Sequence, residues 1–169
     1  LVEMAPEEFG SFRPVAALAA GVLGTTGMES AELARAVTDK LRPSAVIAID
    51  ALAARKVERL CATVQVCDTG ISPGSGVGNH RFALDQESLG VPVIAVGVPT
   101  VVDGATLCAD LLESAGGAPE TDSLPGASLM VTPRDIDQRV EDMAKVIAYG
   151  VTLALQPGLT LTDLEALLE

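Results

Sequence analysis

Carboxylates that follow apolar runs are the residues of this sequence best suited to chemistry. Asp50 ends the run SAVIAID, Asp68 follows the apolar stretch 62–67, and Asp103 ends VPVIAVGVPTVVD. Such runs, bounded by Gly and Pro, are typical of buried strands in a parallel sheet, whose carboxyl ends hold ligand sites in open α/β folds. We therefore predict that Asp50, Asp68 and Asp103 gather at one edge of the sheet, although each could instead cap the helix that follows it.

Grouped carboxylates of this kind could hydrolyse an amide without a nucleophilic side chain. In a partly desolvated cleft, neighbouring acids raise the pKa of one member, so one carboxyl stays protonated while another is ionised. The ionised group could take a proton from water, and the protonated group could donate one to the leaving amine. The tripeptide Asp68-Thr69-Gly70 would also suit a pepsin-like protease, but that fold is nearly all β and this sequence predicts helices between buried strands.

A glycine-rich loop at 68–90 separates the second and third runs. Loops of this length in compact domains are usually functional, so we expect its backbone to approach or close over an extended peptide. The stretch GSGVGN fits a dinucleotide-binding fingerprint only in part, and a turn-rich loop is the simpler interpretation. The only histidine of the sequence also lies in this loop, and it is either a solvated surface residue or a catalytic one. The loop residues proposed to meet substrate are Gly74, Gly76, Gly78 and His80.

Composition narrows the class of protein. The 169 residues are 49% hydrophobic, which suits a single domain covering 1–169. A net charge of −12 with 2% aromatic residues disfavours binding to nucleic acid or to anionic membranes. Three cysteines without CxxC spacing indicate neither a disulfide framework nor a zinc site, so we expect a cytoplasmic protein without a metal or other cofactor.

The remaining stretches predict elements around these strands. A helix should follow the Thr26/Glu29 capping-box spacing and end at Pro43, and 51–60 is a short helix-prone stretch. A helix follows Asp103, and 117–128 reads as a flexible polar insertion. A long helix should begin at an N-cap Thr132 and end before 157–158, with a short helix after it. The residues of the long helix that we expect to be buried form one stripe: Ile136, Val140, Met143, Ile147 and Val151.

Several long stretches of the sequence form recognisable motifs. They are GVLGTTGMESAE, VIAIDALAARKVERL, VQVCDTGISPGSGVGNHR, LGVPVIAVGVPTVVDGAT and VTPRDID. Together they resemble the germination protease family of spore-forming bacteria, from about residue 12 to about residue 155. The resemblance implies a three-layer α/β/α sandwich with a mainly parallel sheet, similar to hydrogenase maturation proteases. It also implies an endopeptidase made as a zymogen, assembled as a homotetramer, and active on small acid-soluble spore proteins in the spore core.

The family's aspartate-based mechanism uses two aspartates, and its IDAL motif matches Asp50. The other family aspartate lies upstream of the FRPV stretch, where residues 1–13 contain no aspartate. We therefore expect a C-terminal fragment without the N-terminal strand, with Asp50 catalytic and Asp68 and Asp103 supporting. Two alternatives stay open: a metal-sensing maturation protease of the same architecture, or a non-catalytic fragment that acts in folding or assembly.

Overall fold

The computed structural model describes residues 5–21, 28–73, 82–118 and 129–168. Contacts divide the chain into two compact units, one formed by Ala19–Ile136 and the other by Leu1–Leu18 together with Asp137–Glu169. The first unit holds a β-sheet with helices, and the described secondary structure of the second is helical. The chain is thus an α/β protein, as its alternation of apolar runs and helical patterns predicts.

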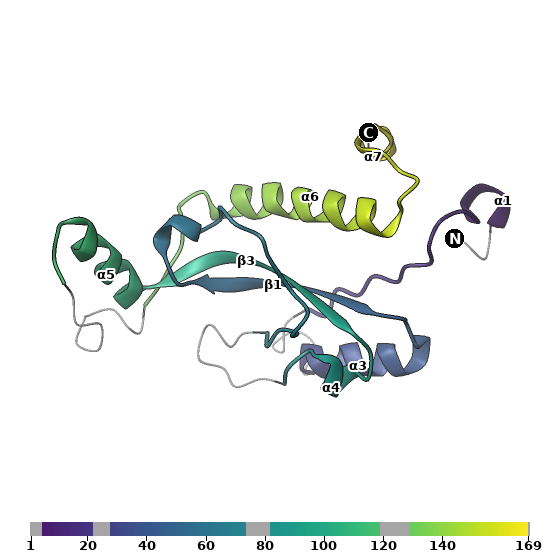
Figure 1. Ribbon diagram of the computed structural model, residues 1–169, viewed down its shortest axis with the longest axis horizontal. Coiled ribbons are helices and arrows are strands. Elements are labelled where there is room, and N and C mark those ends of the chain that lie inside the picture. The colour runs from purple at the N-terminus through teal and green to yellow at the C-terminus, as the bar shows by residue number, and fades with distance from the viewer. Residues whose placement is uncertain (1–4, 22–27, 74–81, 119–128, 169) are drawn as a thin grey trace. The chain divides into compact units, whose positions relative to one another are not determined.

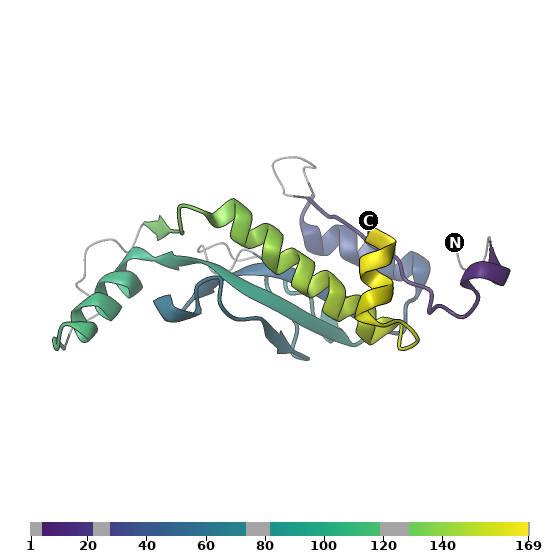
Figure 2. The same cartoon turned by 90° about the horizontal axis from the view of Figure 1, so that it is seen from above.

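The sheet is mixed and is built around β3 (Val93–Asp103). β1 (Val46–Ala54) pairs with β3 in parallel along its whole length, and the two strands lie side by side in Figures 1 and 2. On the other edge of β3, β2 (Gln65–Cys67) and β4 (Met130–Val131) pair with it in antiparallel fashion. A mainly parallel sheet was predicted, and among the described strands only the β1–β3 pair is parallel. β2 is shorter than the strand predicted at 62–67, and both β2 and β4 run antiparallel to β3.

β1 continues past the residue at which the sequence pattern ends it. The stretch 51–54, predicted to begin a helix, forms the last part of the strand, and only η1 (Val57–Arg59), a 3-10 turn, follows it. Pairing with β3 explains the difference, because Ala51 lies opposite Val98 and Ala54 opposite Val102. Alanine's helix propensity is a weak preference that tertiary pairing overrides. Asp50 therefore lies in the middle of β1, not at its end.

Among the described residues of this unit, three α-helices accompany the sheet. α3 (Ser30–Leu41) confirms the predicted helix, but its capping box joins Glu29 to Glu32, with the Glu29 N–H donating to Oε2 of Glu32 at 3.1 Å. The predicted cap Thr26 lies outside the described residues. α4 (Gln86–Leu89) is a single turn, and α5 (Gly104–Ser114) follows β3 directly, as predicted.

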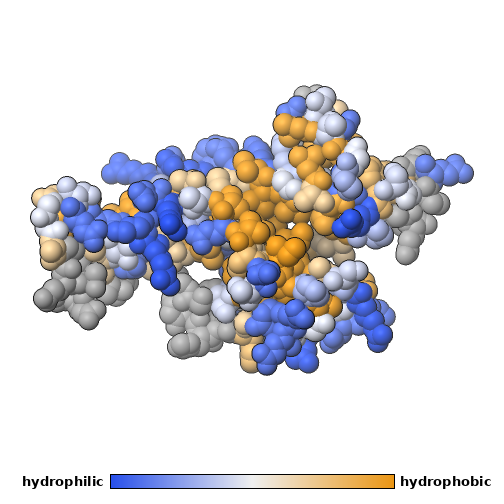
Figure 3. Space-filling view, in the orientation of Figure 1, coloured by the Kyte–Doolittle hydropathy of each residue, from blue (hydrophilic) through white to orange (hydrophobic). Residues whose placement is uncertain are grey.

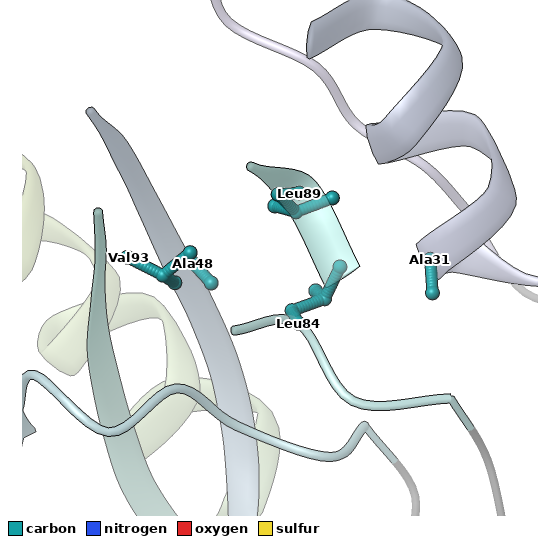
Figure 4. Packing of buried hydrophobic residues seen from close by; sticks show 5 residues of the cluster. All are labelled: Ala31, Ala48, Leu84, Leu89 and Val93. Carbon is teal, nitrogen blue, oxygen red and sulfur yellow. The ribbon is translucent and has the colours of Figure 1, made fainter. Parts of the chain in front are cut away.

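The core of the sheet unit lies where α3 and α4 cover the first halves of β1 and β3. Figure 4 shows Leu84 and Leu89 between Ala31 of α3 and the strand residues Ala48 and Val93. Val93 exposes only 2% of its surface and Leu89 only 5%. The outward surface of α3 is hydrophilic in Figure 3, as expected for an amphipathic helix that packs one face on a sheet.

The helical unit contains α1 (Pro6–Phe9), α6 (Ile136–Leu155) and α7 (Leu161–Leu168). Gln156 joins its two segments, since its Nε2 donates to the Arg13 carbonyl at 2.9 Å and its Oε1 accepts from the Arg13 N–H at 2.7 Å. α6 begins at Ile136, later than the predicted cap at Thr132, and ends before residue 157 as predicted. None of its residues is buried, so the stripe predicted to be buried is at most half-buried.

Candidate functional site

Asp50 occupies an unusual position for a carboxylate. It lies at the centre of a nine-residue strand whose other members are all Ala, Val, Ile or Leu. Its side chain is half-buried, and within the described residues no hydrogen bond or ion pair involves it. A partly desolvated carboxylate without a partner costs free energy, because its charged form loses contact with water and gains no compensating bond. Stability alone therefore gives no reason for an acid at this place.

Four other aspartates of the described chain have clear structural roles. The Asp103 carboxylate caps α5 by accepting from the Thr106 hydroxyl and from the Thr106 N–H, the latter at 2.8 Å. These bonds, the hydroxyl's above all, hold the pKa of Asp103 below its usual value. Asp85 caps α4 by accepting from the Ser88 N–H at 2.8 Å, and this backbone bond lowers its pKa most.

The other two structural aspartates bind backbone groups in the same way. Asp110 of α5 accepts from the Val57 N–H at 2.7 Å and from Lys56 Nζ at 3.0 Å, which fixes η1 to α5. The Val57 N–H contributes most to the lowered pKa of Asp110. Asp163 of α7 accepts from both the hydroxyl and the N–H of Thr160, and its pKa is lowered mainly by the hydroxyl.

Asp68 differs from this group because it is exposed and has no described hydrogen bond. It follows β2, and because β2 runs antiparallel to β3, Asp68 lies toward the beginning of β3. The turn after it depends on Gly70, whose φ is 84° and whose backbone approaches the 84–85 segment closely. There Ile71 and Leu84 form an antiparallel bridge. The Ile71 N–H donates to the Leu84 carbonyl with an N-to-O distance of 3.0 Å, and the Leu84 N–H donates to the Ile71 carbonyl at 2.7 Å. The glycine of the Asp-Thr-Gly tripeptide is thus explained by packing.

The prediction that three aspartates meet at one edge of the sheet is wrong. Asp50 lies opposite Gly97 of β3, while Asp103 lies six residues further along β3, about 20 Å away at strand spacing. Asp68 lies on the other side of this level, three residues beyond Gln65, or about 10 Å along the sheet. The antiparallel direction of β2 and the continuation of β1 past Asp50 separate the three groups. The loop residues Gly74, Gly76, Gly78 and His80 lie outside the described residues, as does most of the predicted insertion at 117–128.

The structure adds two residues to the Asp50 level that the sequence pattern does not reveal. Gly97 pairs with Asp50 on one side and with Gln65 of β2 on the other. Paired residues of neighbouring strands project from the same face, so Asp50 and Gln65 flank a position without a side chain. The Leu52 side chain lies over Gly97, because a Cβ built on that glycine would come within 2.6 Å of Leu52 Cγ. Strand pairing alone brings these four residues together.

Among the described residues, no three or more His, Cys, Asp or Glu side chains are grouped so that they could hold a metal ion. In the same part of the chain, no helix is long and apolar enough to cross a membrane. The feature that remains is one half-buried carboxylate in the middle of the mixed sheet, with no hydrogen-bond partner among the described residues. A carboxylate can act as a general base toward a water molecule within hydrogen-bonding reach.

Comparison with known proteins identifies the family. The sequence profile described as germination protease matches residues 1–115, and the chain belongs to that family. A germination protease of Clostridium perfringens is 43% identical over 94% of this chain and 57% of its own length. Those of Caldanaerobacter subterraneus and Halalkalibacterium halodurans are 44% and 38% identical, over 99% and 94% of this chain. The chain spans between 57% and 60% of the length of these relatives.

Proposed function

We propose that this chain is the part of a spore-germination endopeptidase that carries one of its catalytic carboxylates, Asp50. The substrates are small acid-soluble spore proteins in the spore core, and the enzyme is an aspartate-dependent homotetramer made as a zymogen. Its sheet forms the middle of a three-layer α/β/α sandwich of the hydrogenase maturation protease type. The observation that carries the proposal is the contrast between Asp50, which has no partner among the described residues, and the four aspartates that bind backbone groups.

In this mechanism the Asp50 carboxylate takes a proton from water as the water oxygen attacks the scissile carbonyl carbon. The carbonyl becomes a tetrahedral oxyanion, the C–N bond then breaks, and a second carboxylic acid protonates the leaving amine. Neither Asp68 nor Asp103 lies at the level of Asp50 in the sheet. We therefore assign the second carboxyl to a group outside the described residues and give Asp103 the role of a helix cap. Asp68 retains at most a supporting role near the substrate.

Asp50→Asn tests this assignment, since the amide keeps the shape of the side chain and removes its basicity. Cleavage of a small acid-soluble spore protein, followed by mass spectrometry, should slow by about 10²- to 10⁴-fold. The melting temperature should stay the same or rise, because the substitution removes a half-buried unpaired charge.

Asp103→Asn is the matched control, because asparagine can still cap α5. The Asp103→Asn variant should cleave at nearly the normal rate. In a separate test, chelation of divalent metals should leave the wild-type rate unchanged. Near-normal turnover by Asp50→Asn would remove Asp50 from the catalytic role. Inhibition by a chelator would instead favour the metal-sensing alternative.

A further inference from the structure

Gln65 is the residue that faces Asp50 across the sheet. The two lie on β2 and β1, and both pair with Gly97 of the strand between them. Their Cα atoms are therefore about 10 Å apart, the width of two strand spacings. Because paired residues project from the same face, a carboxylate and a carboxamide stand on either side of a glycine.

The surroundings make this level different from its neighbours. Two residues earlier in each strand, and on the same face, Ala48 and Ala95 form a pair. They expose only 8% and 3% of their surface and belong to the buried interior. At the Gly97 level, Asp50 is half-buried and Gln65 is exposed, whereas Gly97 between them is buried, so the face is open to solvent toward the Gln65 side and covered at its centre. The Leu52 side chain lies over Gly97 between them. The result is an apolar floor with one polar side chain at each margin.

Gln65 has hydrogen-bonding capacity that the described structure does not use. No hydrogen bond within the described residues involves its carboxamide, which offers two N–H donors and a carbonyl acceptor. A peptide group also carries one donor and one acceptor, so a carboxamide can pair with it through two hydrogen bonds. An extended polypeptide crossing the Leu52 floor would present such a peptide group to Gln65 while a neighbouring carbonyl lay near Asp50.

We propose that Gln65 is a substrate-binding residue whose carboxamide holds a main-chain peptide group of an extended polypeptide adjacent to the bond that Asp50 attacks. The proposal rests on the catalytic role proposed for Asp50 and adds the second side of that site. Binding through the main chain does not depend on substrate side chains, so Gln65 sets the position of the polypeptide and not its sequence preference. Its loss should therefore weaken substrate binding without changing the chemical step.

Gln65 also has a purely structural interpretation that the test must separate. β2 is a short strand at the margin of the sheet and all three of its residues are exposed. Polar side chains on such strands limit unwanted pairing with other chains. Under that interpretation, any polar residue with good strand propensity would replace Gln65, and only solubility or stability would change.

Steady-state cleavage of a small acid-soluble spore protein by Gln65→Ala, Gln65→Thr and Gln65→Glu distinguishes the substrate-binding role of Gln65 from a purely structural one. We expect KM to rise about tenfold for all three, equivalent to about 1.4 kcal/mol of binding, with kcat and the melting temperature unchanged. Threonine keeps the strand propensity and polarity of the position, and glutamate keeps its shape but cannot donate. Val66→Thr, on the opposite face of β2 and 66% exposed, is the control and should leave KM unchanged.

A binding measurement keeps this result separate from the role of Asp50. In the Asp50→Asn background, the dissociation constant for the fluorescently labelled substrate protein should also rise about tenfold on Gln65→Ala. Unchanged KM and unchanged binding in the Gln65 variants, with Asp50→Asn inactive, would overturn the role of Gln65 and leave that of Asp50 intact. Normal KM for Gln65→Thr alone would support the structural interpretation. If Asp50→Asn cleaves normally, the proposed function fails, and the binding constants still decide whether Gln65 holds substrate.

Discussion

The cap of α5 allows a sharp test of which aspartates are structural. Asp103 holds the first turn of this helix through the N–H and the hydroxyl of Thr106. Asp103→Ala removes both bonds and leaves the Thr106 N–H without its partner. Loss of an N-cap residue costs about 1 kcal/mol, within a range of about 0.5–2. For a chain of this size, that corresponds to a fall in melting temperature of about 2–4 °C per kcal/mol.

Asp103→Asn should lose less stability than Asp103→Ala. The asparagine oxygen can accept the Thr106 N–H, so only the interaction of a negative charge with the helix N-terminus is lost, about 0.3–1 kcal/mol. Urea unfolding followed by circular dichroism measures both differences. Specific activity per folded molecule should match the wild type in both variants, because the capped carboxylate lies about 20 Å along β3 from the Asp50 level.

The same cap predicts a pH dependence with a definite sign. The pKa of Asp103 is lowered in the folded chain, first by the Thr106 hydroxyl and then by its N–H. Its contribution to stability is therefore full above the unfolded pKa of about 3.9 and is lost as the pH falls through the lower folded pKa. The stability advantage of the wild type over Asp103→Asn should shrink below about pH 4. A loss of activity in Asp103→Asn as large as that in Asp50→Asn, at equal stability, would refute this reasoning and return Asp103 to the catalytic site.

Two glycine substitutions test the packing around the proposed site. Gly97→Ala places a methyl group within 2.6 Å of Leu52 Cγ and between Asp50 and Gln65, so it should cost about 1–3 kcal/mol in thermal unfolding and reduce cleavage as well. Gly70→Ala meets both a φ of 84° and the 84–85 backbone, with Asp85 Cβ only 2.7 Å away, and should destabilise the chain by at least about 1 kcal/mol. Gly150→Ala is the control for both, since nothing lies within 4 Å of its Cβ position in α6 and alanine should stabilise that helix by about 0.5–1 kcal/mol. Unchanged stability of Gly97→Ala would show that Leu52 moves freely and does not form a fixed floor.

Local signals in the sequence were sufficient for much of the secondary structure. The helix that becomes α3 was predicted from the Thr26/Glu29 spacing and from Pro43, and a helix was predicted directly after Asp103. The end of α6 before residue 157 follows from the Pro-Gly pair. Each of these depends on residues within one or two turns, which is the range over which capping and helix propensity act. The family could be recognised for a related reason, because its motifs are long contiguous stretches.

Errors in the sequence prediction arose where partners distant in the chain decide the outcome. The stretch 51–54 has helix-prone residues but joins β1, because β3 offers it a full set of strand partners. β2 was expected to run parallel to its neighbours, yet nothing within its three residues determines direction. Thr132 was expected to cap α6, but its hydroxyl donates to the Thr100 carbonyl at 2.8 Å, before the helix begins at Ile136.

For the candidate site, the sequence determined the kind of group and the fold determined its surroundings. Asp50 could be selected from the sequence, because an acid at the end of an apolar run is conspicuous and its motif resembles that of a protease family. Only the tertiary structure showed that Asp103 binds Thr106 while Asp50 has no partner among the described residues. The register of β1 and β2 on β3 also placed Gln65, 15 residues away in the sequence, at the level of Asp50. Register is a property of three strands together, so no single stretch of the sequence contains it.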